Sequence, residues 1–286
     1  YLEWTSHVLE DPDLTAELES VKGQEDEIND RFYRDLEFGT GGLRGVIGAG
    51  TNRMNIYTVR KATQGVADYI NQNFKNGSVA ISHDSRIKSD LFAKEVARVC
   101  AANGVKAYIY PELMPTPMLS FAVRALHCSM GVMITASHNP AKYNGYKAYG
   151  PDGCQITNET ADAVLANILS VNECDGVKLT DFDEALKSGM ISYIGQDVME
   201  SYYENVLKQS IHPEIARESG FKVVYTPLNG TGNKPVREIL KRIGIQDVTV
   251  VKEQELPDGN FPTCPFPTPE IKQALELGMK YCEETG

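Results

Sequence analysis

Apolar residues recur along the chain with a spacing that alternates between that of a helix and that of a strand. Residues 58–75 have apolar side chains at helical spacing, and the pattern ends at Asn76-Gly77, a typical helix stop. The next apolar run predicts a buried strand at 78–84. Helix, strand, helix and strand are then expected at residues 91–104, 105–110, 116–126 and 130–136. Such alternation predicts parallel strands with helices packed on the faces of the sheet.

A second alternating segment begins near residue 196. The expected order is helix, strand, helix, strand and helix, at residues 197–210, 221–227, 234–244, 246–253 and 268–284. We therefore predict a helical extension at 1–36, a first domain at 37–195 that ends in a connector at 174–195, and a second domain at 196–286. A further strand would be expected after the last helix, so the second domain looks incomplete. The fold class is α/β, with two three-layer α/β/α domains and mainly parallel mixed sheets.

Composition narrows the class of protein. The 286 residues fit about two domains, and 42% hydrophobic with 23% charged residues is typical of globular proteins. A net charge of −11 argues against general binding to nucleic acid or to a membrane surface. The six cysteines are scattered without a CxxC pair, and the N-terminus does not look like a signal peptide. We expect free thiols and a cytoplasmic protein.

The segment TASHNP, residues 135–140, is the first candidate for chemistry. It follows the expected strand at 130–136, so Ser137 would be presented on rigid backbone, as a nucleophile or a phosphoryl carrier requires. No GxSxG surrounds this serine. SHNP alone is more often a simple turn, but the residues that follow it favour a functional serine over a simple turn. Lys147 lies ten residues further on, in an expected return strand, where it can serve as acid, base or phosphate partner; alone it would more often be a surface lysine.

Three other polar loops are expected near the strand ends. FGTGGLRG, residues 38–45, places four glycines around Arg44 and suits either an anion or a flexible turn. HDSR, residues 83–86, offers Asp84 and Arg86, or simply caps the next helix. In residues 226–240, TPLNGTGNKPVREIL, Thr231 to Lys234 could face an anion, although a plain strand–helix connection is the simpler interpretation. No His/Cys/Asp/Glu cluster has metal-ligand spacing.

Together these segments resemble the α-D-phosphohexomutase family of phosphoglucomutases and phosphomannomutases. TASHNPAKYNGYKAYGPDG is similar to that family's phosphoserine loop and FGTGGLRG to its arginine loop, while the proline-rich PDGNFPTCPFPTPE, which we expect to be an ordered surface loop, resembles a loop of its second domain. The N-terminal extension and the sequence of the arginine loop look most like the phosphoglucomutase/phosphopentomutase branch.

The resemblance implies a role for each matching residue. Ser137 would carry the phosphoryl group, give it to a sugar monophosphate and recover it from the bisphosphate intermediate. Lys147 would be a general acid–base residue, Arg44 would share that role or stabilise charge, and His138 would line the pocket. Weaker candidates for contact with substrate or phosphate are Asp84, Arg86, Asn139 and Asn144.

The resemblance also implies what this chain would lack. Complete members have four domains, and a DxDxD loop holds Mg²⁺ together with the phosphoserine. The chain has no DxDxD, so only Ser137, through its phosphate, would be a metal ligand here and the other ligands would lie outside. We therefore expect a nearly inactive N-terminal half, whose partners are a small phosphosugar and its own C-terminal domains. Glucose 1,6-bisphosphate would be the activator, and glucose the first choice among the sugars.

Two alternatives stay open. The chain can be a non-catalytic phosphosugar-binding or regulatory module that keeps the fold. It can also be a serine hydrolase, which would need a histidine and an acid to converge on Ser137; of the five histidines, only His83 and His138 are expected near it.

Overall fold

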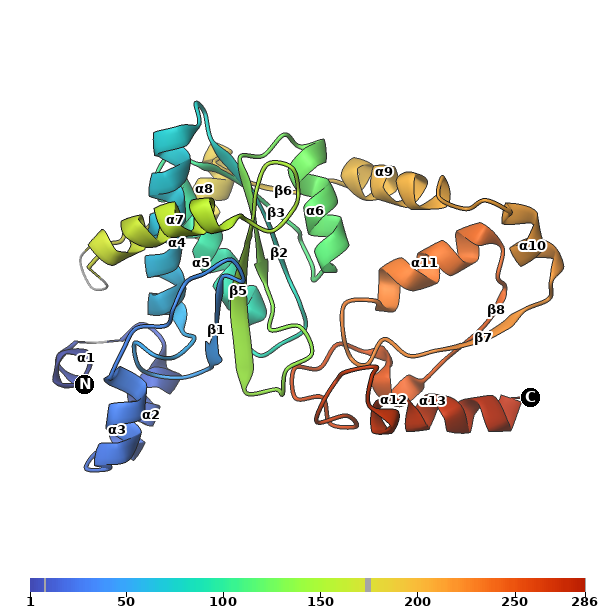
Figure 1. Cartoon of the computed structure of the whole chain (residues 1–286), viewed down its shortest axis with the longest axis horizontal. Helices are drawn as coiled ribbons and strands as arrows, with labels where there is room; N and C mark the ends of the chain where they lie inside the picture. Colours follow the sequence, from blue (N-terminus) through green and yellow to red (C-terminus); the bar gives the residue numbers. More distant parts are fainter. Residues whose placement is uncertain (8, 173–175, 286) are drawn as a thin grey trace.

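The computed structural model describes residues 1–7, 9–172 and 176–285. Figure 1 shows a larger lobe that contains the N-terminus and a smaller lobe that contains the C-terminus. The larger lobe is built on the strands β1(Leu43–Val46), β2(Ser78–His83), β3(Lys106–Ile109), β4(Met130–Ile134), β5(Tyr143–Tyr149) and β6(Ile191–Tyr193). Its helices are α1(Leu2–Ser6), α2(Pro12–Ser20), α3(Glu25–Phe32), α4(Ile56–Asn73), α5(Ser89–Ala102), α6(Thr116–Ala125), α7(Asn158–Ser170) and α8(Phe182–Ser188).

These six strands form one sheet in the order β1-β5-β4-β2-β3-β6. The strands β4, β2, β3 and β6 run parallel, while β5 is antiparallel to both β4 and β1. All residues of β4 and the middle of β2 are buried, as expected for central strands covered on both faces. The predicted mainly parallel α/β sheet is confirmed. Because β2 and β4 are parallel neighbours, the loops that follow them begin side by side.

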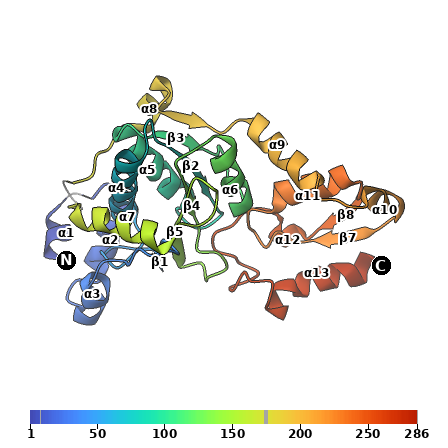
Figure 2. The same cartoon turned by 45° about the horizontal axis from the view of Figure 1, so that its top comes forward.

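The long helix α4 shows how local sequence and packing combine. Asn55 caps its first turn in a capping box with Thr58, so the helix begins two residues before the predicted start. At Gly65 an added Cβ would lie 2.4 Å from the side chain of Ile168, so glycine permits the close crossing of α4 and α7. In Figure 2, α4, α5 and α7 lie together beside the sheet, whereas α6 lies on its other side.

Two segments differ from the expectation. The predicted connector 174–195 contains α8 and β6, and β6 joins the sheet beside β3. A strand of three residues is too short to produce a readable alternation and forms because β3 offers it hydrogen bonds. The helix α7 was also not predicted from the sequence. Cys174 lies outside the described residues, and the other five cysteines are free, as predicted.

The smaller lobe has a parallel pair of strands with helices on both sides. Its elements are α9(Gln196–Leu207), α10(Pro213–Glu218), β7(Lys222–Tyr225), α11(Asn233–Ile243), β8(Asp247–Val250), α12(Lys252–Glu255) and α13(Lys272–Thr285). In Figures 1 and 2, α11 and α13 lie on opposite sides of the strand pair. The helix α9 contacts α6 of the larger lobe as well as α11, so the predicted boundary near residue 195 stays a prediction.

The N-terminal helices are tied to the larger lobe by charge. Arg60 on α4 is almost fully buried and pairs with Glu95 on α5 at 2.5 Å and with Glu10 at 2.6 Å. Arg98 also bonds Glu95, whose side chain is buried. A buried charge that loses its partner is costly, so this cluster ties the N-terminal extension and two helices together.

No helix among the described residues is long and apolar enough to span a membrane.

Replacing Glu95 with alanine should lower the free energy of unfolding by about 3 kcal/mol, because it removes one of two carboxylates from the buried guanidinium of Arg60. Denaturant unfolding followed by circular dichroism measures this change. Glu37→Ala is the matched control, since its ion pair with Arg34 is exposed and should contribute less than about 1 kcal/mol. Equal losses in the two variants would contradict the assignment.

Candidate active site

Ser137 lies in a tight turn directly after β4. Its N–H donates to Thr135 Oγ1 at 2.9 Å, and the N–H of Asn139 donates to the carbonyl of Ala136 at 3.2 Å. The backbone of Ser137 is left-handed, with φ of 57°, which is unusual for a residue with a side chain. The residue is exposed, and its Oγ lies 3.4 Å from Nδ1 of His138. The turn therefore presents an accessible hydroxyl on backbone whose hydrogen bonds are satisfied.

Arg86 is hydrogen-bonded to the backbone of this turn. Its guanidinium donates to four carbonyl oxygens, at distances of 2.6 to 3.0 Å. These carbonyls belong to Ser137, Asn139, Pro140 and Tyr143. The side chain is completely buried, and its Nε lies 3.3 Å from Asp84 Oδ2. Both terminal nitrogens of Arg86 thus bond the backbone of the turn, and its predicted contact with phosphate stays a prediction.

Asn144 bonds the surrounding backbone, and its predicted contact with substrate or phosphate stays a prediction. It is fully buried, and its amide donates to the carbonyl of Ile87 and to Ser89 Oγ while its own oxygen accepts from the N–H of Gly145. Asn139 contributes its backbone to the turn. Both asparagines therefore help to set the backbone around Ser137.

Asp84 shapes the loop that leads into α5. Its Oδ1 accepts from the N–H of Arg86 at 2.9 Å and from Ser89 Oγ at 2.8 Å. The N-cap of α5 is Lys88, without a side-chain cap hydrogen bond, so the interpretation of HDSR as a helix cap is wrong. Asp84 also lines the cavity described below. His83, the other residue near this strand end, has its Nδ1 2.9 Å from the carbonyl oxygen of Asp84.

Lys147 and Arg44 share one face of the sheet. In the register, Lys147 lies opposite Met133 and Arg44 opposite Gly145. Side chains in register, or two residues apart on a strand, point to the same face, so both basic groups lie on the face of Met133 and Thr135. Partial burial, assisted by the positive charge of Arg44, holds the pKa of Lys147 below its usual value, and the charge of Asp84 opposes this shift.

The pKa of Lys147 is thus shifted in the direction that acid–base work requires, and its role as acid or base stays a prediction. Arg44 is exposed, as is His138, which lies next to Ser137 and does not line the cavity.

The glycine-rich segment before β1 is a compact turn. The N–H groups of Gly39 and Gly42 each donate to the other residue's carbonyl, so these two groups are not free to bind an anion. Gly42 has φ of 76°, and an added Cβ would lie 1.8 Å from the carbonyl oxygen of Tyr146. Glycine is required there because the turn presses on β5, directly before Lys147.

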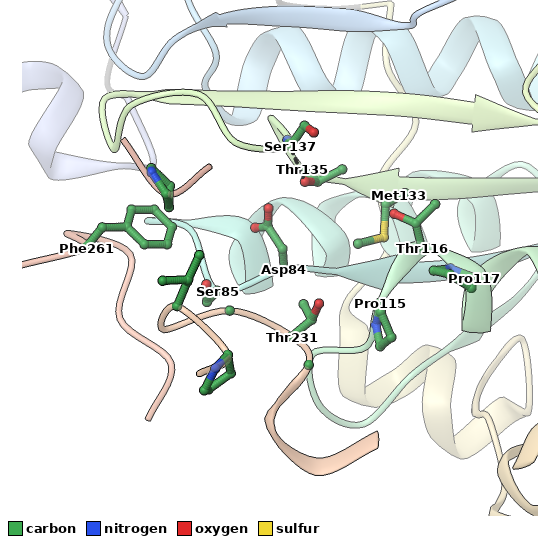
Figure 3. Close-up of a pocket in the computed structure, with 15 residues that line it drawn as sticks. Asp84, Ser85, Pro115, Thr116, Pro117, Met133, Thr135, Ser137, Thr231 and Phe261 are labelled. Atoms are coloured by element: carbon green, nitrogen blue, oxygen red, sulfur yellow. Dashed lines mark hydrogen bonds between the residues drawn. The ribbon is translucent and has the colours of Figure 1, made fainter. Parts of the chain in front are cut away.

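A cavity of about 370 Å³ opens beside Ser137, between the two lobes. The larger lobe contributes Asp84, Ser85, Pro115, Thr116, Pro117, Met133, Thr135 and Ser137 to it. The smaller lobe contributes Pro227, Leu228, Gly230, Thr231, Gly232, Phe261 and Pro267. Figure 3 shows Asp84 between the Ser137 turn and Thr231. The loop after β7, which sequence alone left as a plain connection, thus belongs to the site.

Some residues that line the cavity were not predicted from the sequence. Thr135, Thr116 and Phe261 line it without having been singled out from the sequence. Thr135 opens the TASHNP segment, two residues before Ser137, so its position was predictable from the sequence. Lys234, a possible anion contact on sequence grounds, forms an ion pair with Glu112 of the larger lobe.

Among residues 1–7, 9–172 and 176–285, no group of three or more His, Cys, Asp or Glu side chains is arranged to hold a metal ion. Asp84 is the one carboxylate that lines the cavity within that part of the chain, and its Oδ1 is already engaged. The described residues therefore do not fit a magnesium site by themselves.

Comparison with known proteins agrees with this architecture. Residues 35–174 match the family description "Phosphoglucomutase/phosphomannomutase, alpha/beta/alpha domain I", and residues 200–286 match the description of domain II. The chain therefore belongs to the phosphoglucomutase/phosphomannomutase family and corresponds to its N-terminal domains.

Individual relatives carry several names. The chain is 39% identical to a phosphoglucomutase of Staphylococcus saprophyticus, over 91% of this chain and 47% of the relative. It is 38% identical to the phosphoribomutase of Saccharomyces cerevisiae, over 92% of this chain and 44% of the relative. With the human phosphopentomutase the identity is 32%, over 94% and 46%. The chain thus spans about half the length of the curated relatives it matches.

Solved structures show the same fold. A phosphomannomutase-type protein from Thermus thermophilus matches with a TM-score of 0.74 at 25% identity, over 88% of this chain and 53% of that protein. A family protein from Burkholderia thailandensis matches with a TM-score of 0.66 at 22% identity, over 87% and 50%. The predicted α-D-phosphohexomutase family and its α/β fold are confirmed.

Arg44→Gln should raise the pKa of Lys147, because it removes the positive charge that helps to hold that pKa down. A larger fraction of Lys147 would then be protonated at a given pH, so its amine should be acylated more slowly by acetic anhydride between pH 7 and 9. Peptide mass spectrometry measures the rate at this position, and the exposed Lys142 serves as internal reference. An unchanged or faster rate at Lys147 would contradict the electrostatic coupling.

Proposed function

We propose that this chain is part of a phosphosugar mutase that interconverts sugar 1-phosphate and sugar 6-phosphate, with Ser137 as the phosphoryl carrier. The observation that carries the proposal is the exposed Ser137 hydroxyl, in a left-handed turn at the edge of the cavity between the lobes. Membership in the family supports it, as do the names of the relatives.

The chemistry can be written from the side chains present. In the forward half-reaction, the phosphoryl group leaves Ser137 Oγ for a hydroxyl of the sugar monophosphate. The sugar hydroxyl gives its proton to a base, and the released Ser137 Oγ takes up a proton. In the return half-reaction, Ser137 Oγ loses its proton as it accepts the other phosphoryl group, and the released sugar oxygen takes up a proton. Lys147 is the proposed proton carrier, because its lowered pKa makes its amine easier to deprotonate than that of an ordinary lysine.

Arg44 is proposed to stabilise the charge on the transferring group, which phosphoryl transfer demands more than any covalent help. The ring of His138 lies beside the serine hydroxyl but outside the residues that line the cavity, so its role in the pocket stays a prediction. Divalent metal would supply further charge neutralisation in the complete protein. Since the described residues do not form its site, no step is assigned to it here.

The preferred sugar is proposed to be glucose, with glucose 1,6-bisphosphate as activator. Named relatives include a phosphoglucomutase as well as a phosphoribomutase and a phosphopentomutase, so pentose phosphates are the competing substrates. Relative kcat/KM for glucose 1-phosphate and ribose 1-phosphate, measured on the full-length protein, decides between them.

The non-catalytic binding module is the second candidate. It shares the fold and the cavity with the mutase. It differs in one measurable respect, since a binding module need not carry phosphate on Ser137.

The full-length protein incubated with glucose 1,6-bisphosphate and magnesium should carry phosphate on Ser137, found by tandem mass spectrometry of its peptides. Ser137→Ala should lose both the phosphate and mutase activity, by at least about 10⁴-fold, because no other group can carry the phosphoryl.

The matched control is Ser85→Ala, which removes another hydroxyl from the same cavity and should leave phosphate on Ser137. A folded protein without phosphate at Ser137 would sink the mutase proposal in favour of the binding module. Labelling of Ser137 by a fluorophosphonate would instead favour a serine hydrolase.

A further inference from the structure

The buried guanidinium of Arg86 contacts both lobes. On one side it donates to the four carbonyls of the Ser137 turn. On the other side its Cζ lies 5.3 Å from the ring centroid of Phe261, which belongs to the loop between α12 and α13 of the smaller lobe. Phe261 is only 5% exposed, so this cation–π contact is shielded from water, where such contacts are strongest.

The same loop also presses on the backbone beside Arg86. At Gly259, an added Cβ would lie 2.6 Å from the N of Ile87 and 2.9 Å from the carbonyl oxygen of Ser85. No side chain fits there, and the two backbones are in direct contact. The loop therefore meets residues 85–87 at two points, through the Phe261 ring and through the glycine.

The loop itself is built as a defined structure. The N–H of Phe261 donates to the carbonyl of Asp258, and its carbonyl accepts from the N–H of Cys264. The buried Gln254 joins the loop to the strand end after β7, because its side chain bonds both Thr263 and Thr226. The loop is thus expected to move with the smaller lobe, so its contact with Arg86 depends on the position of that lobe relative to the larger lobe.

Backbone conformation supports a functional reason for these contacts. Ser137, Leu228 and Phe261, from three different loops that line the cavity, all have positive φ, at 57°, 50° and 48°. Such conformations are costly for residues with side chains and persist where the surroundings hold them. At Ser137 the surroundings are the four hydrogen bonds from Arg86.

We propose that Arg86 is a positioning residue for Ser137 and that Phe261 with Gly259 forms an inter-lobe latch. Seating of the smaller lobe on residues 85–87 fixes the guanidinium, and the guanidinium fixes the left-handed turn that presents the serine hydroxyl. When the lobe is displaced, Arg86 loses its aromatic neighbour and the turn loosens. The competence of Ser137 thereby depends on the closure of the cavity. The catalytic part of this proposal rests on the proposed function, whereas the structural coupling does not.

The structural coupling is tested by hydrogen–deuterium exchange on the full-length protein. Phe261→Ala should speed exchange in peptides that cover residues 136–143 by about tenfold, the effect of losing one shielded cation–π contact. Gly259→Ala should do the same by a different route, because its methyl group forces the loop off the backbone of Ile87. Exchange in peptides that cover β2 should stay unchanged in both variants.

Phe266→Ala is the matched control. It removes the same ring from the same loop, but Phe266 is 56% exposed and does not line the cavity. It should leave exchange at 136–143 as in the parent protein. If Phe261→Ala and Gly259→Ala also leave it unchanged while the protein stays folded, the latch is disproved.

The catalytic part has its own measurement. In Phe261→Ala, the rate at which glucose 1,6-bisphosphate phosphorylates Ser137 should fall about tenfold at saturating ligand, with little change in the ligand concentration that gives half the maximal rate. Arg86→Lys keeps the charge but cannot donate to four carbonyls, so it should reproduce this loss of rate.

A parallel loss of ligand affinity, or an unchanged rate, would overturn the positioning role. Faster exchange together with no phosphorylation of Ser137 even in the parent protein would instead keep the coupling and reject the proposed mutase function.

Discussion

The site depends on the hydrogen bonds that the buried guanidinium of Arg86 donates to the turn around Ser137. The turn between the end of β4 at Ile134 and the start of β5 at Tyr143 has several backbone carbonyls pointing inward, and each would be costly to bury without a donor. Arg86 satisfies four of them at once. Its own charge is balanced by Asp84, 3.3 Å away, which also shapes the loop that carries Arg86. One side chain thus joins the ends of two parallel strands into a single unit.

The placement of the basic groups follows from the strand direction. Because β5 runs antiparallel to β4 and to β1, the chain brings Lys147 and Arg44 onto one face next to Met133. Burial and mutual repulsion then lower the pKa of Lys147 in a protein whose net charge is −11. A local positive site in an acidic protein suits a small anionic ligand better than a nucleic acid, since the basic groups are few and lie within one site.

Much of the fold and part of the site were predictable from the chain. The helix α4, the strands β2 and β4, and the polar turn after β4 have strong patterns of their own. Arg86 and Asn144 were correctly placed near that turn, but their roles were assigned to phosphate. Residue type marks a guanidinium or an amide as a partner for oxygen, and only the tertiary structure shows that the oxygens belong to the backbone. The strand β6 was missed because its three residues carry no readable pattern without β3 beside them.

Sequence alone determined the alternation of helix and strand and identified the candidate residues, which are a serine after a buried strand, a lysine on the return strand and an arginine after glycines. These features are local, and local spacing along the chain is enough to read them. The tertiary structure alone decided that a loop more than 120 residues beyond the serine supplies Phe261 to the same site. That contact depends on how two lobes pack against each other, and packing between distant segments leaves no periodic trace in a single sequence.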